Sequence, residues 1–149
     1  MNKLVHALVL TGLVGLPTFS MAAEEPASPH TLSGNVGITS DYIFRGISQT
    51  GGDPAIQGGL DYTHSSGFYV GTWGSNVGWI EDFQGYQSGN VELDLYGGFR
   101  GGIGETGITY DVGIASYFYP GEANGAVDAD TTEVYAALGW KWFTAKYYY

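Results

Sequence analysis

Residues 90–100 constrain the fold more than any other stretch of this chain. Apolar and polar positions alternate here without a break, as Val91, Leu93, Leu95, Gly97 and Phe99 against Asn90, Glu92, Asp94, Tyr96, Gly98 and Arg100. Successive side chains of a strand point to opposite faces of its sheet. This stretch therefore predicts a strand with one apolar face and one face that carries two carboxylates and a guanidinium.

The same alternation recurs along the chain, separated by turn-forming segments. Glycine contributes 25 of the 149 residues, which favours many strands and turns over helices. Six strands and the start of a seventh are predicted, over residues 32–45, 55–63, 68–77, 90–100, 108–119, 132–142 and 144–149. The sequence thus predicts one all-β domain over residues 31–149, built as an antiparallel up-and-down meander.

The composition of the third strand does not show which of its residues lie on the apolar face, so this assignment depends on the length of the preceding turn. We predict a turn of even length over residues 64–67, which pairs Tyr62 with an odd-numbered residue on the same face. Tyr69, Trp73 and Val77 are then expected on the apolar side.

Three features favour a transmembrane β-barrel over a soluble sandwich, the main alternative for an alternating all-β chain. Longer loops follow the first, third and fifth strands, shorter turns generally follow the others, and most strands approach the roughly 9–11 residues needed to cross a bilayer. Large aromatics also gather in two levels, as lipid-facing girdles do. The predicted girdle residues are Tyr42, Phe44 and Phe118 at one end, and Tyr62, Tyr69, Phe99, Tyr110, Trp140 and Trp142 at the other.

The opposite face of these strands is charged. Its predicted lumen-lining residues are Asp41, Arg45, Asp61, Glu92, Asp94, Arg100, Asp111, Glu133 and Lys141. In a water-filled lumen the excess of acids would concentrate cations. The alternative is that these charges pair across strands and fill a narrow barrel. Arg45 with Asp41 or Asp61 is the pair that we most expect to be structural.

The first 22 residues have the parts of a secretory signal peptide. Lys3 precedes an apolar run of about 13 residues, too short to span a bilayer, and residues 20–22 form a small-x-small cleavage site. Cleavage after Ala22 would leave four basic and 15 acidic residues, a formal charge of −11. Residues 23–30 are predicted to be a flexible lead-in. Export to the bacterial outer membrane is the expected localisation.

Composition and spacing exclude several other classes of protein. The chain has no cysteine, hence no disulfide, thiolate metal site or lipid-anchoring thiol, and few bases with which to bind nucleic acid. Asp128, Asp130 and Glu133 form only part of a calcium loop, so neither a metal nor another cofactor is expected. His64, Ser65 and Ser66 lack the positioned groups that a serine nucleophile needs, and no enzyme activity is predicted.

Four segments resemble a known family. Residues 40–49 (SDYIFRGISQ), 54–59 (PAIQGG), 92–98 (ELDLYGG) and 132–135 (TEVY) are similar to blocks of the TorF-type porins of Gram-negative bacteria. The resemblance implies an outer-membrane β-barrel of largely uncharacterised substrate, and it carries over no catalytic or binding residue. Members of that family continue beyond this length, so a truncated barrel is expected.

A porin is the function that these observations predict. Small hydrophilic solutes or cations would diffuse passively through the lumen, and outer-membrane lipid and lipopolysaccharide would surround the wall. The first alternative is a plugged barrel that serves adhesion or envelope stability. The second is an outer-membrane lipid enzyme.

Overall fold

The computed structural model describes residues 28–123, 125 and 127–149. Seven strands form one antiparallel sheet in the order β1-β4-β5-β6-β7-β8-β9, so each long strand pairs with the next one along the chain. The strands are β1 (His30–Thr39), β4 (Ala55–His64), β5 (Phe68–Asn76), β6 (Val91–Gly102), β7 (Ile108–Phe118), β8 (Thr131–Trp140) and β9 (Phe143–Tyr148). The predicted all-β fold and meander order are confirmed.

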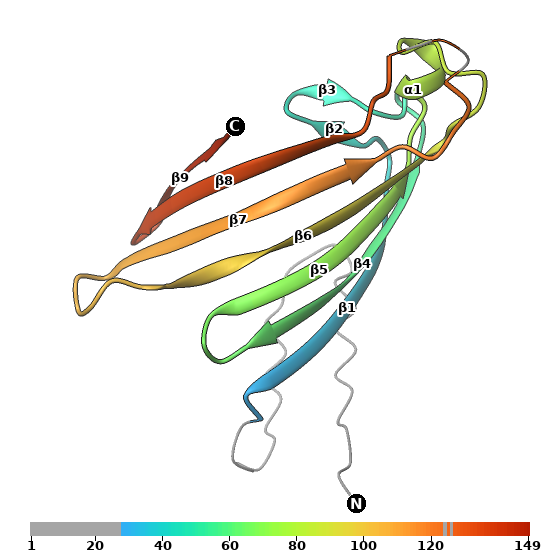
Figure 1. Ribbon diagram of the computed structural model, residues 1–149. Coiled ribbons are helices and arrows are strands. Elements are labelled where there is room, and N and C mark those ends of the chain that lie inside the picture. Colours follow the sequence, from blue (N-terminus) through green and yellow to red (C-terminus); the bar gives the residue numbers. More distant parts are fainter. Residues whose placement is uncertain (1–27, 124, 126) are drawn as a thin grey trace, which may run out of the picture.

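The sheet is curled and open. Figure 1 shows a strongly twisted surface with short turns at one end and longer loops at the other, and β1 does not pair with β9. The structure therefore contains a curved seven-stranded wall and not a closed barrel. The predicted signal peptide and residues 23–27 of the predicted lead-in lie outside the described residues. His30, at the end of that lead-in, already belongs to β1 and pairs with His64.

Two elements at the loop end were not predicted. A short hairpin of β2 (Ile43–Phe44) and β3 (Ile47–Ser48) follows β1, and helix α1 (Trp79–Asp82) lies in the loop after β5. The helix packs Ile80 against Val77 and Tyr86, and the three are the buried centre of a small loop cluster. No helix among the described residues is long and apolar enough to span a membrane.

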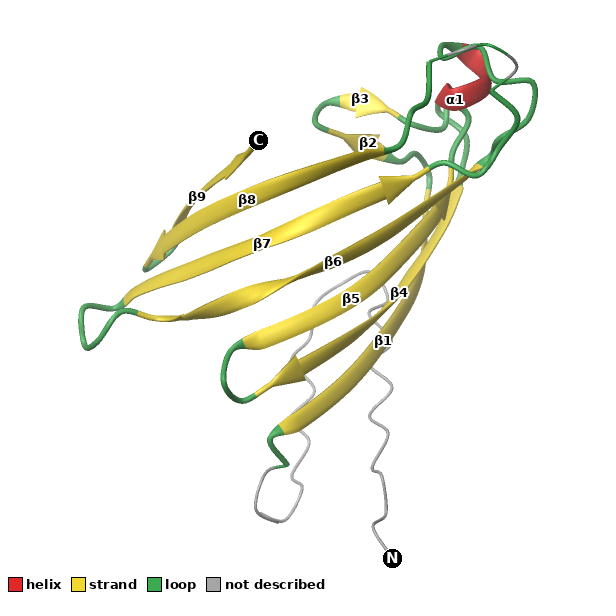
Figure 2. Cartoon of the chain, viewed as in Figure 1, coloured by secondary structure: helices red, strands yellow, loops and turns green. Residues whose placement is uncertain are grey.

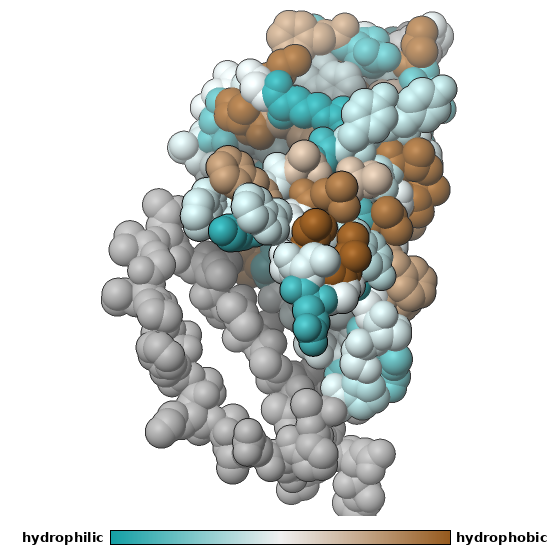
Figure 3. Space-filling model, turned by 90° about the vertical axis from the view of Figure 1, so that its left-hand side faces the viewer, coloured by the Kyte–Doolittle hydropathy of each residue, from teal (hydrophilic) through white to brown (hydrophobic). Residues whose placement is uncertain are grey.

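Large apolar side chains cover the convex face of the sheet and remain exposed. In Figure 3, hydrophobic residues gather along the right-hand margin of the described part of the molecule. Nineteen large apolar residues of this face are between 36% and 72% exposed, and they are Leu32, Val36, Ile38, Ile56, Leu60, Phe68, Val70, Val91, Leu93, Leu95, Phe99, Val112, Ile114, Phe118, Val134, Leu138, Trp140, Phe143 and Tyr147.

Charge divides between the two faces with no exception in the seven strands. The convex positions contain no Asp, Glu, Lys or Arg. All seven charged strand residues point to the concave face, and they are Asp61, Glu92, Asp94, Arg100, Asp111, Glu133 and Lys146. The sheet thus places its polar side chains inside the curve and its apolar side chains outside.

Candidate site on the concave face

Tyrosine hydroxyls and aspartates form a hydrogen-bonded network inside the curve. Tyr69 on β5 donates to Asp111 on β7, and its hydroxyl also contacts that of Tyr135 on β8. Because Tyr69 has one hydroxyl proton, Tyr135 is the donor in the second bond. Beside them, Tyr96 donates to Asp61 over 2.6 Å. The Tyr69–Tyr135 contact passes over two intervening strands, which only the concave side of a curled sheet allows.

Glycine makes room for these rings. Tyr69, Tyr96 and Tyr135 lie directly across from Gly98, Gly71 and Gly113 of the neighbouring strand. A Cβ added to Gly71 would lie 2.5 Å from the Tyr96 ring, and one on Gly113 would lie 2.5 Å from the Tyr135 hydroxyl. Each ring therefore lies over a paired glycine, whose missing side chain leaves the space that the ring occupies.

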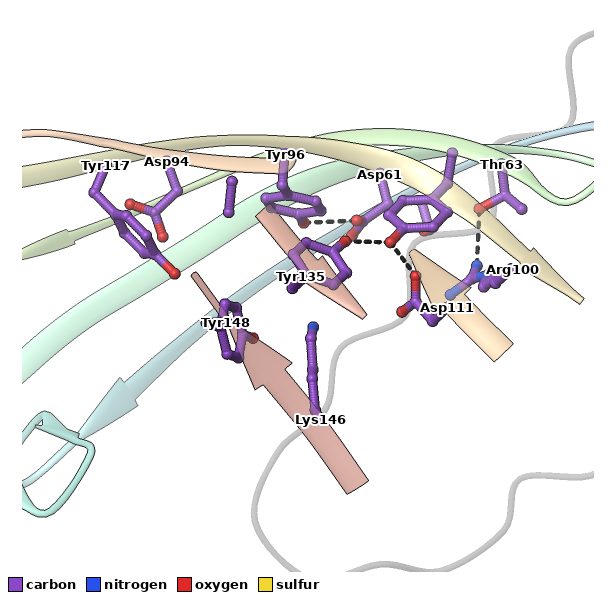
Figure 4. Close-up of a pocket in the computed structure, with 13 residues that line it drawn as sticks. Asp61, Thr63, Asp94, Tyr96, Arg100, Asp111, Tyr117, Tyr135, Lys146 and Tyr148 are labelled. Carbon is purple, nitrogen blue, oxygen red and sulfur yellow. Dashed lines mark hydrogen bonds between the residues drawn. The ribbon is translucent and has the colours of Figure 1, made fainter. Parts of the chain in front are cut away.

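The network surrounds a hollow of about 480 Å³. In Figure 4, Asp94, Tyr117 and Tyr96 approach this hollow from one side, and Lys146 and Tyr148 of β9 approach it from the other. The Lys146 ammonium lies 3.7 Å from the centre of the Tyr135 ring, and the Arg100 guanidinium lies 5.0 Å from that of Tyr69. Both are cation–π distances. Electron-rich rings, carboxylates and two cations thus face one water-accessible space.

Glu92 and Asp94 are neighbouring acids on the concave side of β6. Glu92 is 2% exposed, and its carboxylate accepts a 2.8 Å hydrogen bond from Tyr42. Burial raises the pKa of the Tyr42 phenol far above its ordinary value, so this hydroxyl keeps its proton and donates. Asp94 Oδ1 is buried without a hydrogen-bond partner among the described residues.

Three predicted lumen residues lie off the strands. Asp41 follows β1 and accepts hydrogen bonds from the hydroxyls of Ser48 and Thr50. The Ser48 hydroxyl is the main reason that the pKa of Asp41 is lowered. Arg45 occupies the turn of the β2–β3 hairpin, and Lys141 lies in the β8–β9 turn with its ammonium 4.5 Å from the Trp140 ring.

The prediction that Arg45 pairs with Asp41 or Asp61 is wrong. Its guanidinium donates to both carboxylate oxygens of Glu133 on β8, over 2.9 and 2.8 Å, and contacts neither Asp41 nor Asp61. This bidentate bond raises the pKa of Arg45. The two residues are 88 positions apart, so only the fold of the hairpin over the sheet brings them together.

Four predicted girdle residues are not on the convex face. Tyr42 and Phe44 belong to residues 40–50, the inward hairpin, because the chain leaves β1 at Thr39 and does not continue as a strand to Arg45. Tyr69 lies on the concave face because the turn before β5 has three residues, 65–67, and not four. Trp142 lies in the β8–β9 turn and is 81% exposed.

The remaining predicted aromatics lie on the convex face. They are Tyr62, Phe99, Tyr110, Phe118 and Trp140, and all except Phe118 lie toward the turn end of the sheet. Phe68 joins them there, with its ring centre 6.3 Å from that of Tyr62 and 5.5 Å from that of Phe99. The structure therefore has one aromatic level at the turn end and lacks most of the second level.

The three-residue turn also moves Trp73 to the concave face. Its ring lies edge-on to Tyr42, at 5.4 Å between ring centres. Sequence analysis missed this turn and did not name Tyr69, Tyr135 or Lys146 as inward site residues, although it placed Tyr96 on the polar face of its strand. A partial signal was available for Tyr96 and Tyr135, since each interrupts a polar strand face, but the glycine opposite each ring depends on the strand register. Within the described ranges no group of three or more metal-binding side chains occurs.

Comparisons with known proteins add a family and no activity. Neither the curated proteins nor the solved structures give a match to this chain. One family model matches residues 23–149, which is most of the sequence and includes every strand described above. The chain therefore belongs to the Gcw_chp family, described as "Bacterial protein of unknown function (Gcw_chp)".

Proposed function

We propose that this sheet is part of the wall of an outer-membrane β-barrel, with lipid on its convex face and water on its concave face. The separation of charge carries the proposal. Seven strands present 19 exposed large apolar residues on one face and no charged residue there, while all seven charged strand residues lie on the other. Transmembrane barrels combine an apolar outside with a polar inside in this way.

The same face would be costly in water. Monomeric soluble proteins rarely expose contiguous apolar patches larger than a few hundred Å², and this one runs over all seven strands. The concave face offers no apolar core in exchange, because its buried centre consists of Tyr69, Tyr135 and Ala115 beside carboxylates. A soluble sandwich would require the reverse arrangement.

Closure of the wall requires strand partners for β1 and β9. Unpaired backbone N–H and C=O groups at a sheet edge cannot remain in hydrocarbon, where no water can bond them. The outer edges of β1 and β9 lack partners within the described part of the chain. In the proposed barrel, further strands pair with both edges.

Passive diffusion of small hydrophilic solutes or cations is the activity that this lining supports best. Five of the seven charged residues on the concave strands are acids, which favours cations in a water-filled passage. The resemblance to TorF-type porins agrees with this activity and stays a prediction. The family match begins at residue 23, next to the proposed cleavage site after Ala22, and it leaves the proposed export signal outside the family model.

A plugged barrel is the second candidate. The inward hairpin and the network of Tyr69, Tyr96 and Tyr135 both occupy space inside the curve, as a filled lumen would require. Such a barrel would act through its outer loops or its stability in the envelope. Electrical conductance separates the two candidates.

Single-channel recording of the native protein in a planar bilayer, under a salt gradient, tests the porin proposal. We expect discrete current steps and a reversal potential biased toward cations. The double substitution Asp94→Asn with Asp111→Asn should reduce that bias, because it removes two inward carboxylates. A folded, inserted protein that never conducts, or an unchanged bias in the double variant, would contradict a cation-preferring pore.

A further inference from the structure

The segment between β1 and β4 folds back into the curve of the sheet. We name residues 40–50 the inward hairpin; its strands β2 and β3 are joined by Arg45 and Gly46, both with positive φ, at 48° and 85°. A two-residue turn of this kind matches the twist of a hairpin. At its base, the Gln49 N–H donates to the Tyr42 carbonyl and the Gln49 carbonyl accepts from Gly78 beside α1.

Contacts of the inward hairpin cross the concave face strand by strand. Tyr42 packs on Trp73 of β5 and donates to Glu92 of β6. Phe44 follows, with its ring centre 6.1 Å from that of Tyr117 on β7. The hairpin follows β1, which lies at one edge of the sheet, and its contact with β7 lies beyond β4, β5 and β6. The hairpin therefore reaches across most of the concave face.

Arg45 completes the crossing at the far edge. Its guanidinium bonds both oxygens of Glu133 on β8 and lies 4.9 Å from the centre of the Tyr148 ring on β9. In Figure 1 the hairpin correspondingly lies beside the loop end of β8. The Arg45 side chain is 50% exposed, whereas that of Glu133 is 18% exposed.

From this crossing we infer that the inward hairpin is the constriction of the proposed pore, and that the Arg45–Glu133 pair holds it in place. The inference rests on the proposed barrel. A segment that spans the concave face from β1 to β9 narrows any passage that the face lines. Arg45 and Glu133 then act as positioning residues that set the width of the passage.

The pair matters because the hairpin has little stability of its own. Its strands have two residues each, and an isolated two-stranded hairpin is at best marginally stable in water. The position of the inward hairpin therefore depends on its contacts with the sheet. Bidentate arginine–carboxylate bonds are among the strongest and most directional of these.

Conductance and solute size limits test the inference in the full chain. We would compare the native protein with Arg45→Ala, Glu133→Gln, and a variant in which a short Gly-Ser linker replaces residues 42–48. The passage should widen, giving a severalfold rise in conductance and faster uptake of larger neutral sugars by proteoliposomes. Lys141→Ala is the matched control, since it removes a base from the β8–β9 turn, away from the hairpin.

The outcomes separate the inference from the proposed function. If the native protein conducts and all three variants keep its conductance and size limit, the hairpin is not the constriction, and the proposed porin function is unaffected. If the native protein and all variants fold but none conducts, both the constriction and the proposed porin function are wrong. A silent native protein that conducts once the hairpin is replaced supports the inference with the hairpin as a plug. If the linker variant fails to fold, Arg45→Ala decides, and the exchange Arg45→Glu with Glu133→Arg should restore native conductance.

Discussion

At the scale of single residues, pairing of glycine with tyrosine organises the concave face. Tyr96 on β6 lies over Gly71, its partner on β5. Its hydroxyl reaches past Gly71 to Asp61, the residue of β4 that pairs with Gly71 on the other side. A polar residue at such a position is visible in the sequence, but its cross-strand partner is not, because register depends on turn length. The inward charges of the strands were therefore predictable, whereas the tyrosine network was not.

Gly71→Ala tests this arrangement. The new Cβ would lie 2.5 Å from the Tyr96 ring and 2.7 Å from Asp61 Oδ1, so the ring must move and its bond to Asp61 is disturbed. We expect a loss of about 1–3 kcal/mol in the free energy of unfolding, as is usual for overpacking, measured by urea unfolding in lipid vesicles. Gly37→Ala is the control, because nothing lies within 4 Å of a Cβ there. Equal effects of the two substitutions would refute the special role of the Gly71 site.

At the scale of elements, alternation located every long strand but not every strand end. The boundaries of β4 through β9 fall within two residues of the predicted ranges, since a period of two is a strong signal for half-buried strands. The first strand, predicted over residues 32–45, ends six residues earlier, at Thr39. Ile43 is apolar where the alternation requires a polar residue, and at this point the chain has turned into the inward hairpin. Hydrogen bonds from Ser48 and Thr50 to Asp41 hold the base of that hairpin.

Substitutions at two neighbouring positions of β1 test whether its convex face contacts lipid and its concave face contacts water. Val36 is on the convex face and Asn35 on the concave face, and both are exposed. If the convex face contacts lipid, Val36→Arg should cost up to about 2–4 kcal/mol of unfolding free energy, depending on its depth in the bilayer. Asn35→Arg should cost far less, because its side chain reaches water. In a sheet with water on both sides, the two substitutions would have similar and small effects, which urea unfolding in vesicles would reveal.

At the scale of the whole molecule, the polar side of the structure is inside and the apolar side is outside. Sequence alternation predicted two chemically distinct faces, yet alternation alone is equally compatible with a soluble sandwich. The curvature decides which face is concave, and it places Asp61, Asp94 and Asp111 there. The open edges at β1 and β9 and the crossing hairpin are properties of the three-dimensional arrangement, and strand periodicity does not encode them.

The orientation of the convex face toward lipid is the central claim, and single-cysteine spin labels test it most directly. The chain has no native cysteine, so labels can be placed one at a time at convex Val36, Leu95, Val112 and Leu138 and at concave Asn35, Thr109 and Thr144. In outer-membrane vesicles, we predict that the convex labels collide mainly with lipid-soluble oxygen and the concave labels with a water-soluble nickel complex. Equal access of the nickel complex to both sets would contradict the account, because the apolar face would then lie in water.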